Sequence, residues 1–93
     1  MLKVRYSARF KKDFKIIQKR GYEINLLEEI ISMLCDEKPL LPKYNDHPLS
    51  GNYSGFRECH ISPDWLLIYK IEKDVSVNLK VSHISFENCT TPN

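Results

Sequence analysis

Three strand-like runs joined by connections of three residues constrain the fold of this chain most strongly. The runs cover residues 56–61, 65–71 and 75–81, and they are rich in β-branched and aromatic side chains. The connections between them, residues 62–64 and 72–74, contain Pro, Asp, Ser, Glu and Lys. Because connections this short join antiparallel neighbours, the sequence predicts an antiparallel meander in its second half.

The N-terminal residues predict a strand followed by an amphipathic helix. Residues 2–6 alternate apolar and basic side chains, which is the period of a strand with one buried face. Ser7 can cap a helix that Gly21 ends. The apolar stripe of this helix has the spacing i, i+4, i+7 and consists of Phe10, Phe14 and Ile17.

A second helix follows after a short link. Asn25 and Glu28 have capping-box spacing, so the helix is expected to begin there, and it should end before Pro39. Its apolar stripe consists of Leu27, Ile30, Ile31 and Leu34. The short link favours an antiparallel helix pair that covers one face of a sheet.

Together these elements give the order β-α-α-β-β-β. We therefore expect an α+β fold with a twisted, largely antiparallel four-stranded sheet and two antiparallel helices packed on it. A chain of 93 residues has room for one core, so a single domain over residues 1–93 is expected.

Several classes of protein do not fit the sequence. The longest apolar run, residues 65–69, is far shorter than the roughly 20 residues that cross a bilayer, so we expect no membrane contact. The N-terminus shows no apolar signal-peptide core, which indicates a cytoplasmic chain. The cysteines form no C-x-x-C pair, so we expect reduced thiols and no metal or cofactor. Unpaired spacing also disfavours a mixed zinc site built from Cys59, His60, His83 and Cys89.

Basic residues gather at the N-terminus although the net charge is only +2. Asp13 is the single acid among the first 20 residues. A cationic helix face attracts polyanions such as RNA, and the candidate contacts on it are Lys11, Lys12, Lys15 and Lys19. A solvated helix face has the same pattern, so charge alone leaves a nucleic-acid role open.

The segment between the second helix and the meander is the first pointer to a functional site. Residues 36–55 form a long connection rich in Pro, Gly, Asn, Asp and Ser, and it contains His47. In a meander, the end of one strand, the start of the next and the end of the third lie at the same edge. That edge gathers four further residues, beside which the loop can place His47: His60, Asp64, Trp65 and His83.

The three histidines have the chemistry for metal-independent cleavage of RNA. A base removes the proton of a 2′-hydroxyl, and an acid protonates the leaving 5′-oxygen. Imidazole titrates near neutral pH and serves in either role, while Asp64 or Glu58 is a candidate carboxylate to orient it.

Cationic and aromatic residues near the histidines are candidate RNA contacts. Arg57 and Lys80 are candidates for the phosphate, and Trp65 and Phe86 for stacking on a base. The alternatives are core packing for Trp65 and plain exposure on a strand for the two cations. Covalent catalysis is disfavoured, because Ser62 lacks a nucleophile elbow and Cys59 would point away from the face of its neighbour His60.

The whole chain resembles the YafQ-type toxins of the RelE/ParE superfamily, the toxic partners of bacterial type II toxin–antitoxin pairs. The resemblance extends from Phe10 to His83. Its most specific parts occur in order as residues 46–51 (DHPLSG), 56–60 (FRECH) and 63–69 (PDWLLIY).

This resemblance implies a RelE-like fold, related to microbial ribonucleases, and a ribosome-dependent endoribonuclease. Such a toxin enters the A site of the 30S subunit, cleaves mRNA during translation and is neutralised by a small, DNA-binding antitoxin. The first helix would face ribosomal RNA, and Trp65 and Phe86 would lie near the substrate. The residues that match the catalytic set of the family are His47, His60, Asp64 and His83.

The C-terminal segment departs from the family pattern. Lys80 replaces the family arginine one place closer to His83, and Phe86 is also one place closer to that histidine. Lysine keeps the charge but loses bidentate phosphate binding, so cleavage is expected to be slower or differently selective. Two rival readings stay open: a ParE-like or weakened binding module that acts by occupancy or in an autorepressing antitoxin complex, and a ribonuclease of naked RNA.

Overall fold

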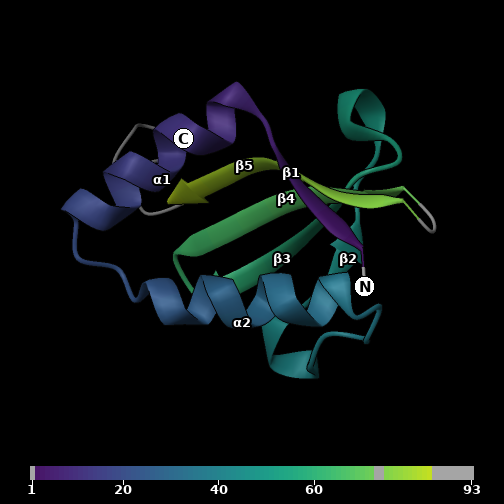
Figure 1. The fold of residues 1–93 in the computed structure, drawn as a ribbon, viewed down its shortest axis with the longest axis horizontal. Helices are drawn as coiled ribbons and strands as arrows, with labels where there is room; N and C mark the ends of the chain where they lie inside the picture. The colour runs from purple at the N-terminus through teal and green to yellow at the C-terminus, as the bar shows by residue number, and fades with distance from the viewer. Residues whose placement is uncertain (1, 73–74, 85–93) are drawn as a thin grey trace.

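The computed structural model describes residues 2–72 and 75–84. In this part of the chain, two helices pack on one face of a five-stranded sheet (Figure 1). The helices are α1 (Ala8–Lys19) and α2 (Ile24–Cys35). The strands are β1 (Lys3–Tyr6), β2 (His47–Pro48), β3 (Arg57–Ser62), β4 (Trp65–Glu72) and β5 (Ser76–Ile84).

The sheet has the order β1-β5-β4-β3-β2. The strands β3, β4 and β5 form the antiparallel meander that the sequence predicts, and β1 pairs in parallel with β5. The predicted α+β class and element order are therefore confirmed. The predicted count of four strands is wrong, because β2 pairs with β3 inside the segment expected to be a loop. A strand of two residues has no periodicity to detect, since only its partner defines it.

Helix α1 begins and ends as predicted. The Ser7 hydroxyl accepts a hydrogen bond from the Phe10 N–H at 2.9 Å, and it donates to the Lys80 carbonyl at 2.6 Å. Gly21, with φ of +75°, allows the turn after the helix. The cap therefore also ties the start of α1 to the middle of β5.

Helix α2 begins earlier than predicted. Its N-cap is Glu23, which makes no side-chain capping bond, so the cap predicted at Asn25 is wrong. Ile24 packs against the core in the first turn, and this burial extends the helix past the local capping signal. The helix ends at Cys35, before Pro39, as expected. In Figure 1, α1 and α2 run in opposite directions across the sheet.

The core lies between the helices and one face of the sheet. Trp65 is fully buried in it, with 0% exposure, and its indole Nε1 donates to the Ser82 hydroxyl at 2.8 Å. The Tyr22 ring meets the indole edge-on, with centroids 5.3 Å apart. A ring enclosed in this way has no free face for a nucleobase, so the predicted stacking role of Trp65 gives way to its alternative, core packing.

Alternation along the strands directs the other residues of the sheet to the opposite face, which we call the open face. It carries Glu58 and His60 on β3, Leu66, Ile68 and Lys70 on β4, and Val81 on β5. The core lies on the helix-covered side, and within the described residues neither helix covers the open face. Within residues 2–72 and 75–84, neither helix has the length and apolar character required to cross a membrane.

One buried charge joins the helix layer to the sheet. Asp13 of α1 is 8% exposed, and its carboxylate accepts hydrogen bonds from the Ser82 backbone N–H at 3.0 Å and from Arg9 Nε at 3.2 Å. Without the carboxylate, the Ser82 N–H would be buried with no acceptor.

We predict that Asp13→Ala lowers the free energy of unfolding by about 1–2 kcal/mol, since an orphaned buried N–H costs more than the helix gains from alanine. Urea denaturation measures the change. Asp13→Asn is the matched control, because its side-chain oxygen still accepts the bond. Equal losses in the two variants would contradict the role given to this acceptor.

Candidate active site

The candidate site lies on the open face, where β2 pairs with β3. His47 stands opposite Glu58 in the antiparallel register, and its Nε2 lies 3.3 Å from Glu58 Oε1. The other ring nitrogen, Nδ1, lies 3.0 Å from the Asn45 carbonyl. A carbonyl only accepts, so Nδ1 is the donor in this contact, while Nε2 faces the Glu58 carboxylate.

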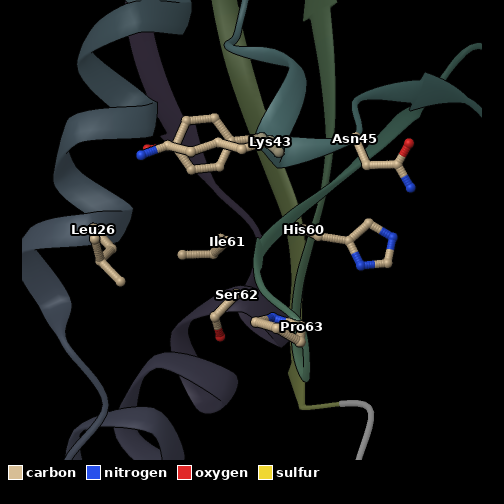
Figure 2. Close-up of a pocket in the computed structure, with 8 residues that line it drawn as sticks. Leu26, Lys43, Asn45, His60, Ile61, Ser62 and Pro63 are labelled. Atoms are coloured by element: carbon tan, nitrogen blue, oxygen red, sulfur yellow. The ribbon is translucent and has the colours of Figure 1, made fainter.

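His60 lies beside this pair. It is two residues along β3 from Glu58 and so faces the same side of the sheet. The His47 and His60 rings are stacked, with centroids 6.2 Å apart and an interplanar angle of 29°. Figure 2 shows His60 and Ile61 leaving β3 in opposite directions, with Asn45 on the His60 side. His60 also contributes to the wall of a cavity of about 510 Å³.

The backbone of His83 belongs to the same row of the sheet. Leu66 of β4 pairs with His60 on one side and with His83 on the other. Two strand spacings separate the histidine backbones, a distance of about 10 Å. The register therefore brings these two positions to one end of the meander. Phe86, the other candidate for stacking on a base, lies outside the described residues.

Asp64 has partners other than the histidines. It lies in the turn between β3 and β4, where its carboxylate accepts from the Tyr22 hydroxyl at 2.7 Å and from the Ser62 hydroxyl at 3.1 Å. The bond from Tyr22 is the largest cause that lowers the pKa of Asp64, and the bond from Ser62 acts in the same direction. Of the two carboxylates that the sequence offers, Glu58 is the one that contacts a histidine among the described side chains, which include those of His47 and His60.

A second cluster holds β2 from the helix-covered side. The Asp46 carboxylate accepts from the buried Tyr69 hydroxyl at 2.6 Å and from Arg57 Nε, and Arg57 Nη2 lies 3.2 Å from Asp46 Oδ2. Burial, and then the bond to Asp46, raises the pKa of Tyr69, so the phenol remains a neutral donor. Adjacent residues of β3 thus hold adjacent residues of the chain at β2 on opposite faces: Arg57 holds Asp46, and Glu58 holds His47.

The contacts among Asp46, Arg57 and Tyr69, which we call the clamp, change the expected role of Arg57 as a phosphate contact. Its guanidinium is engaged by Asp46 next to Tyr69, whereas His60 lies on the open face. Asp46 and Tyr69 were not expected to support the site, and Tyr22 was not expected to contact Asp64. The sequence does carry a signal of these contacts. The dipeptide at 46–47 is an acid followed by a histidine, and the dipeptide at 57–58 is a cation followed by an acid. This complementarity has meaning only once β2 and β3 are known to pair.

The remaining candidate cations lie in two places. Lys80 is the extra residue of a bulge in β5, between the pairs Ile68–Val81 and Tyr69–Leu79, and its side chain is exposed. The lysines of α1 are exposed in the helix layer, on the other side of the sheet from the open face, and they are Lys11, Lys12, Lys15 and Lys19.

The cysteines in the described residues are not reactive groups of the site. Cys35 and Cys59 are free thiols, as the sequence predicts, and both are buried. Burial is the main reason that the pKa of Cys59 rises to about 12, which disfavours a thiolate nucleophile. Among residues 2–72 and 75–84, no group of three or more His, Cys, Asp and Glu side chains has an arrangement that could hold a metal ion.

We predict that Tyr69→Phe loosens the clamp at β2. The loss of the hydrogen bond to Asp46 should lower the free energy of unfolding by about 1 kcal/mol. Amide hydrogen exchange should become faster at residues 45–49. Tyr53→Phe is the matched control, since that exposed residue is outside the clamp. Unchanged exchange in Tyr69→Phe would show that Asp46 does not secure β2.

We also predict a pH-dependent effect for Tyr22→Phe. The pKa of Asp64 lies below its ordinary value of 3.8 in the folded state, so the stabilisation is present above that value and is lost as pH falls through the folded pKa. The variant should be less stable by about 1 kcal/mol near neutral pH, and the difference should shrink toward pH 2. Urea titrations across this range measure it, with Ser62→Ala as a weaker change in the same direction. A difference independent of pH would remove Asp64 as its cause.

Comparison with known proteins agrees with the resemblance seen in the sequence. Residues 2–86 match the family described as YafQ, a bacterial toxin of type II toxin–antitoxin systems. The mRNA interferase toxin YafQ of Escherichia coli K12 is 42% identical over 69 residues, which cover 73% of this chain and 75% of the relative.

Solved structures share the fold over nearly the full length of the chain. A copper-bound mutant toxin from Helicobacter pylori superposes with a TM-score of 0.86 at 37% identity, covering 94% of this chain and 98% of that one. YafQ in the E. coli DinJ–YafQ toxin–antitoxin complex has a TM-score of 0.82 at 34% identity, with 92% and 94% covered. From its sequence, its fold and this similarity, the chain belongs to the YafQ family of bacterial type II toxin–antitoxin toxins.

Proposed function

We propose that this chain is a toxin that cleaves mRNA in the ribosomal A site by metal-independent acid–base chemistry. The observation that carries the proposal is the histidine pair on the open face: His47 in contact with Glu58 at 3.3 Å, and His60 stacked on it at 6.2 Å. Two imidazoles side by side supply a proton acceptor and a proton donor near neutral pH. The activity in the name of the E. coli relative, mRNA interferase, supports this assignment.

The proposed reaction needs two proton transfers and no outside reagent. One imidazole takes the proton from a 2′-hydroxyl, whose oxygen then forms a bond to the adjacent phosphorus. The bond from phosphorus to the 5′-oxygen breaks, and the other imidazole protonates that oxygen. The products are a 2′,3′-cyclic phosphate and a free 5′-hydroxyl.

The other residues of the proposed site have supporting roles. Glu58 orients His47, and the Asp46 clamp keeps β2 against β3. His83 belongs to the catalytic set because its position shares a row with His60 through Leu66. Asp64 remains in the set as an ionised carboxylate at the same end of the meander. Lys80 and Phe86 remain candidate RNA contacts.

The two sides of the molecule suit two RNA contacts on the ribosome. The histidines lie on the open face, and the exposed lysines of α1 lie in the helix layer behind it. We propose that mRNA binds on the open face while the lysines contact ribosomal RNA, and that the toxin acts in the cytoplasm. We also propose a neutralising antitoxin as a partner, by analogy with DinJ in the complex of the E. coli relative.

We predict that His47→Gln, His60→Gln and His83→Ala each reduce mRNA cleavage at least about 100-fold in a purified translation system. The physical reason is the loss of a proton donor or acceptor while the fold is kept, which circular dichroism checks. Wild-type protein should cleave little RNA without ribosomes, since the ribosome aligns the substrate.

Lys38→Gln is the control, because this exposed lysine follows α2 on the helix side. Full cleavage by all three histidine variants would overturn the acid–base mechanism. If they still arrest translation without cleavage, the chain acts by occupancy, as a ParE-like module would. Robust degradation of bare RNA would instead identify a ribosome-independent nuclease.

A further inference from the structure

The open face continues beyond the histidines to a second cavity. This cavity, of about 310 Å³, lies between β1, β4, β5 and the residue that precedes β3. Its wall includes Arg5, Phe56, Lys70 and Lys80. Of these, only Lys80 was a candidate in the sequence, and neither Phe56 nor Lys70 has a part in the proposed chemistry.

The aromatic ring of Phe56 organises the two lysines. The Lys70 Nζ lies 5.6 Å from the ring centroid and the Lys80 Nζ lies 5.5 Å from it. The ring itself is braced by Tyr53, which meets it edge-on at 6.0 Å and 89°. Cation–π contacts at this distance hold both ammonium groups beside the same ring, although their like charges repel each other. Lys80 reaches the ring from the bulge in β5.

The charge of the cavity is positive. Arg5, Lys70 and Lys80 contribute cations, and Glu72 is the acid in the cavity wall. The Glu72 carboxylate accepts a hydrogen bond from Asn78 Nδ2 at 3.0 Å, which occupies one of its oxygens. Two ammonium groups and a guanidinium around one hollow suit a ligand with more than one negative charge, such as the backbone of a nucleic acid.

The cavity and the histidines lie on the same face of the sheet, at different points along β4. Lys70 is four residues along β4 from Leu66, which pairs with both His60 and His83. An even separation keeps both residues on the open face, and four residues of strand span about 13 Å. Leu66 and Ile68, which are half-buried, lie between the two sites and offer apolar surface on which bases can rest. A single strand of RNA a few nucleotides long can therefore reach from the histidines to the cavity.

We propose that this cavity binds backbone phosphates of the single-stranded mRNA whose scissile bond lies at the histidines. This inference rests on the proposed function and extends it, since it gives Lys70 and Phe56 a part in holding the substrate. The α1 lysines lie on the other side of the sheet, so one unfolded strand on the open face does not reach them.

The test uses the full chain and a fluorescent single-stranded RNA with 2′-O-methyl groups, which binds but has no 2′-hydroxyl to react. Fluorescence anisotropy measures the Kd over a range of salt. Lys70→Gln should weaken binding roughly fivefold and lower the slope of log Kd against log salt by about 0.7, the share of one phosphate contact on a single strand. Phe56→Leu should weaken binding in the same direction, because it keeps the apolar volume but frees both lysines.

Lys38→Gln is the matched control and should bind like the wild type. The proposal is overturned if Lys70→Gln and Lys38→Gln have the same Kd and salt slope, or if the wild type does not bind the strand. A folded ribosomal RNA hairpin that competes more strongly than the single strand would also overturn it, in favour of a ribosomal contact.

The same assay separates this inference from the proposed function. If His60→Gln binds the strand normally but does not cleave mRNA, both stand. If the wild type binds as expected and cleaves nothing on the ribosome, the cavity stands and the nuclease assignment fails. If cleavage occurs and Lys70→Gln leaves binding unchanged, the proposal for the cavity is wrong and the nuclease assignment is kept.

Discussion

The alternation of β3 is the constraint on which the rest of the site depends. Adjacent residues of a strand face opposite sides, so Arg57 meets Asp46 on the helix-covered face while Glu58 meets His47 on the open face. The segment at β2 is too short to hold itself in place by backbone pairing alone. Two side-chain contacts, one on each face, fix its register, and a shift by one residue would exchange both faces.

This two-sided arrangement puts the residues that hold β2 on one face of the sheet and the histidines on the other. The buried Tyr69 hydroxyl and the Asp46 carboxylate lie on the core side, where desolvation makes their hydrogen bond strong. The histidine rings lie on the solvent-accessible side, where protons and a polymeric substrate can reach them. Asp13 and Asp46 have similar structural roles. The Asp13 carboxylate joins α1 to β5 through the Ser82 N–H, and the Asp46 carboxylate joins the segment at β2 to β4 through the Tyr69 hydroxyl.

Local signals predicted the regular elements well and the site only in part. The meander, the first helix and its Ser7 cap follow from periodicity, short turns and capping, which act within a few residues of sequence. The Asn25 cap failed because burial of Ile24 outweighed a local preference. From the sequence, Trp65 was a candidate for stacking on a base, with core packing as the alternative, and its bond to Ser82 and the Tyr22 ring favour the core.

The sequence by itself determined the α+β class, the meander that aligns the positions of His60 and His83, and membership of the YafQ family, because all three depend on residue types and spacing along the chain. Only the tertiary structure decided that His47 meets Glu58, that Asp64 is held by Tyr22, and that Phe56 gathers Lys70 with Lys80. These are contacts between side chains from separate elements. Their geometry depends on strand register, a bulge and a two-residue strand, none of which leaves a periodic pattern in the sequence.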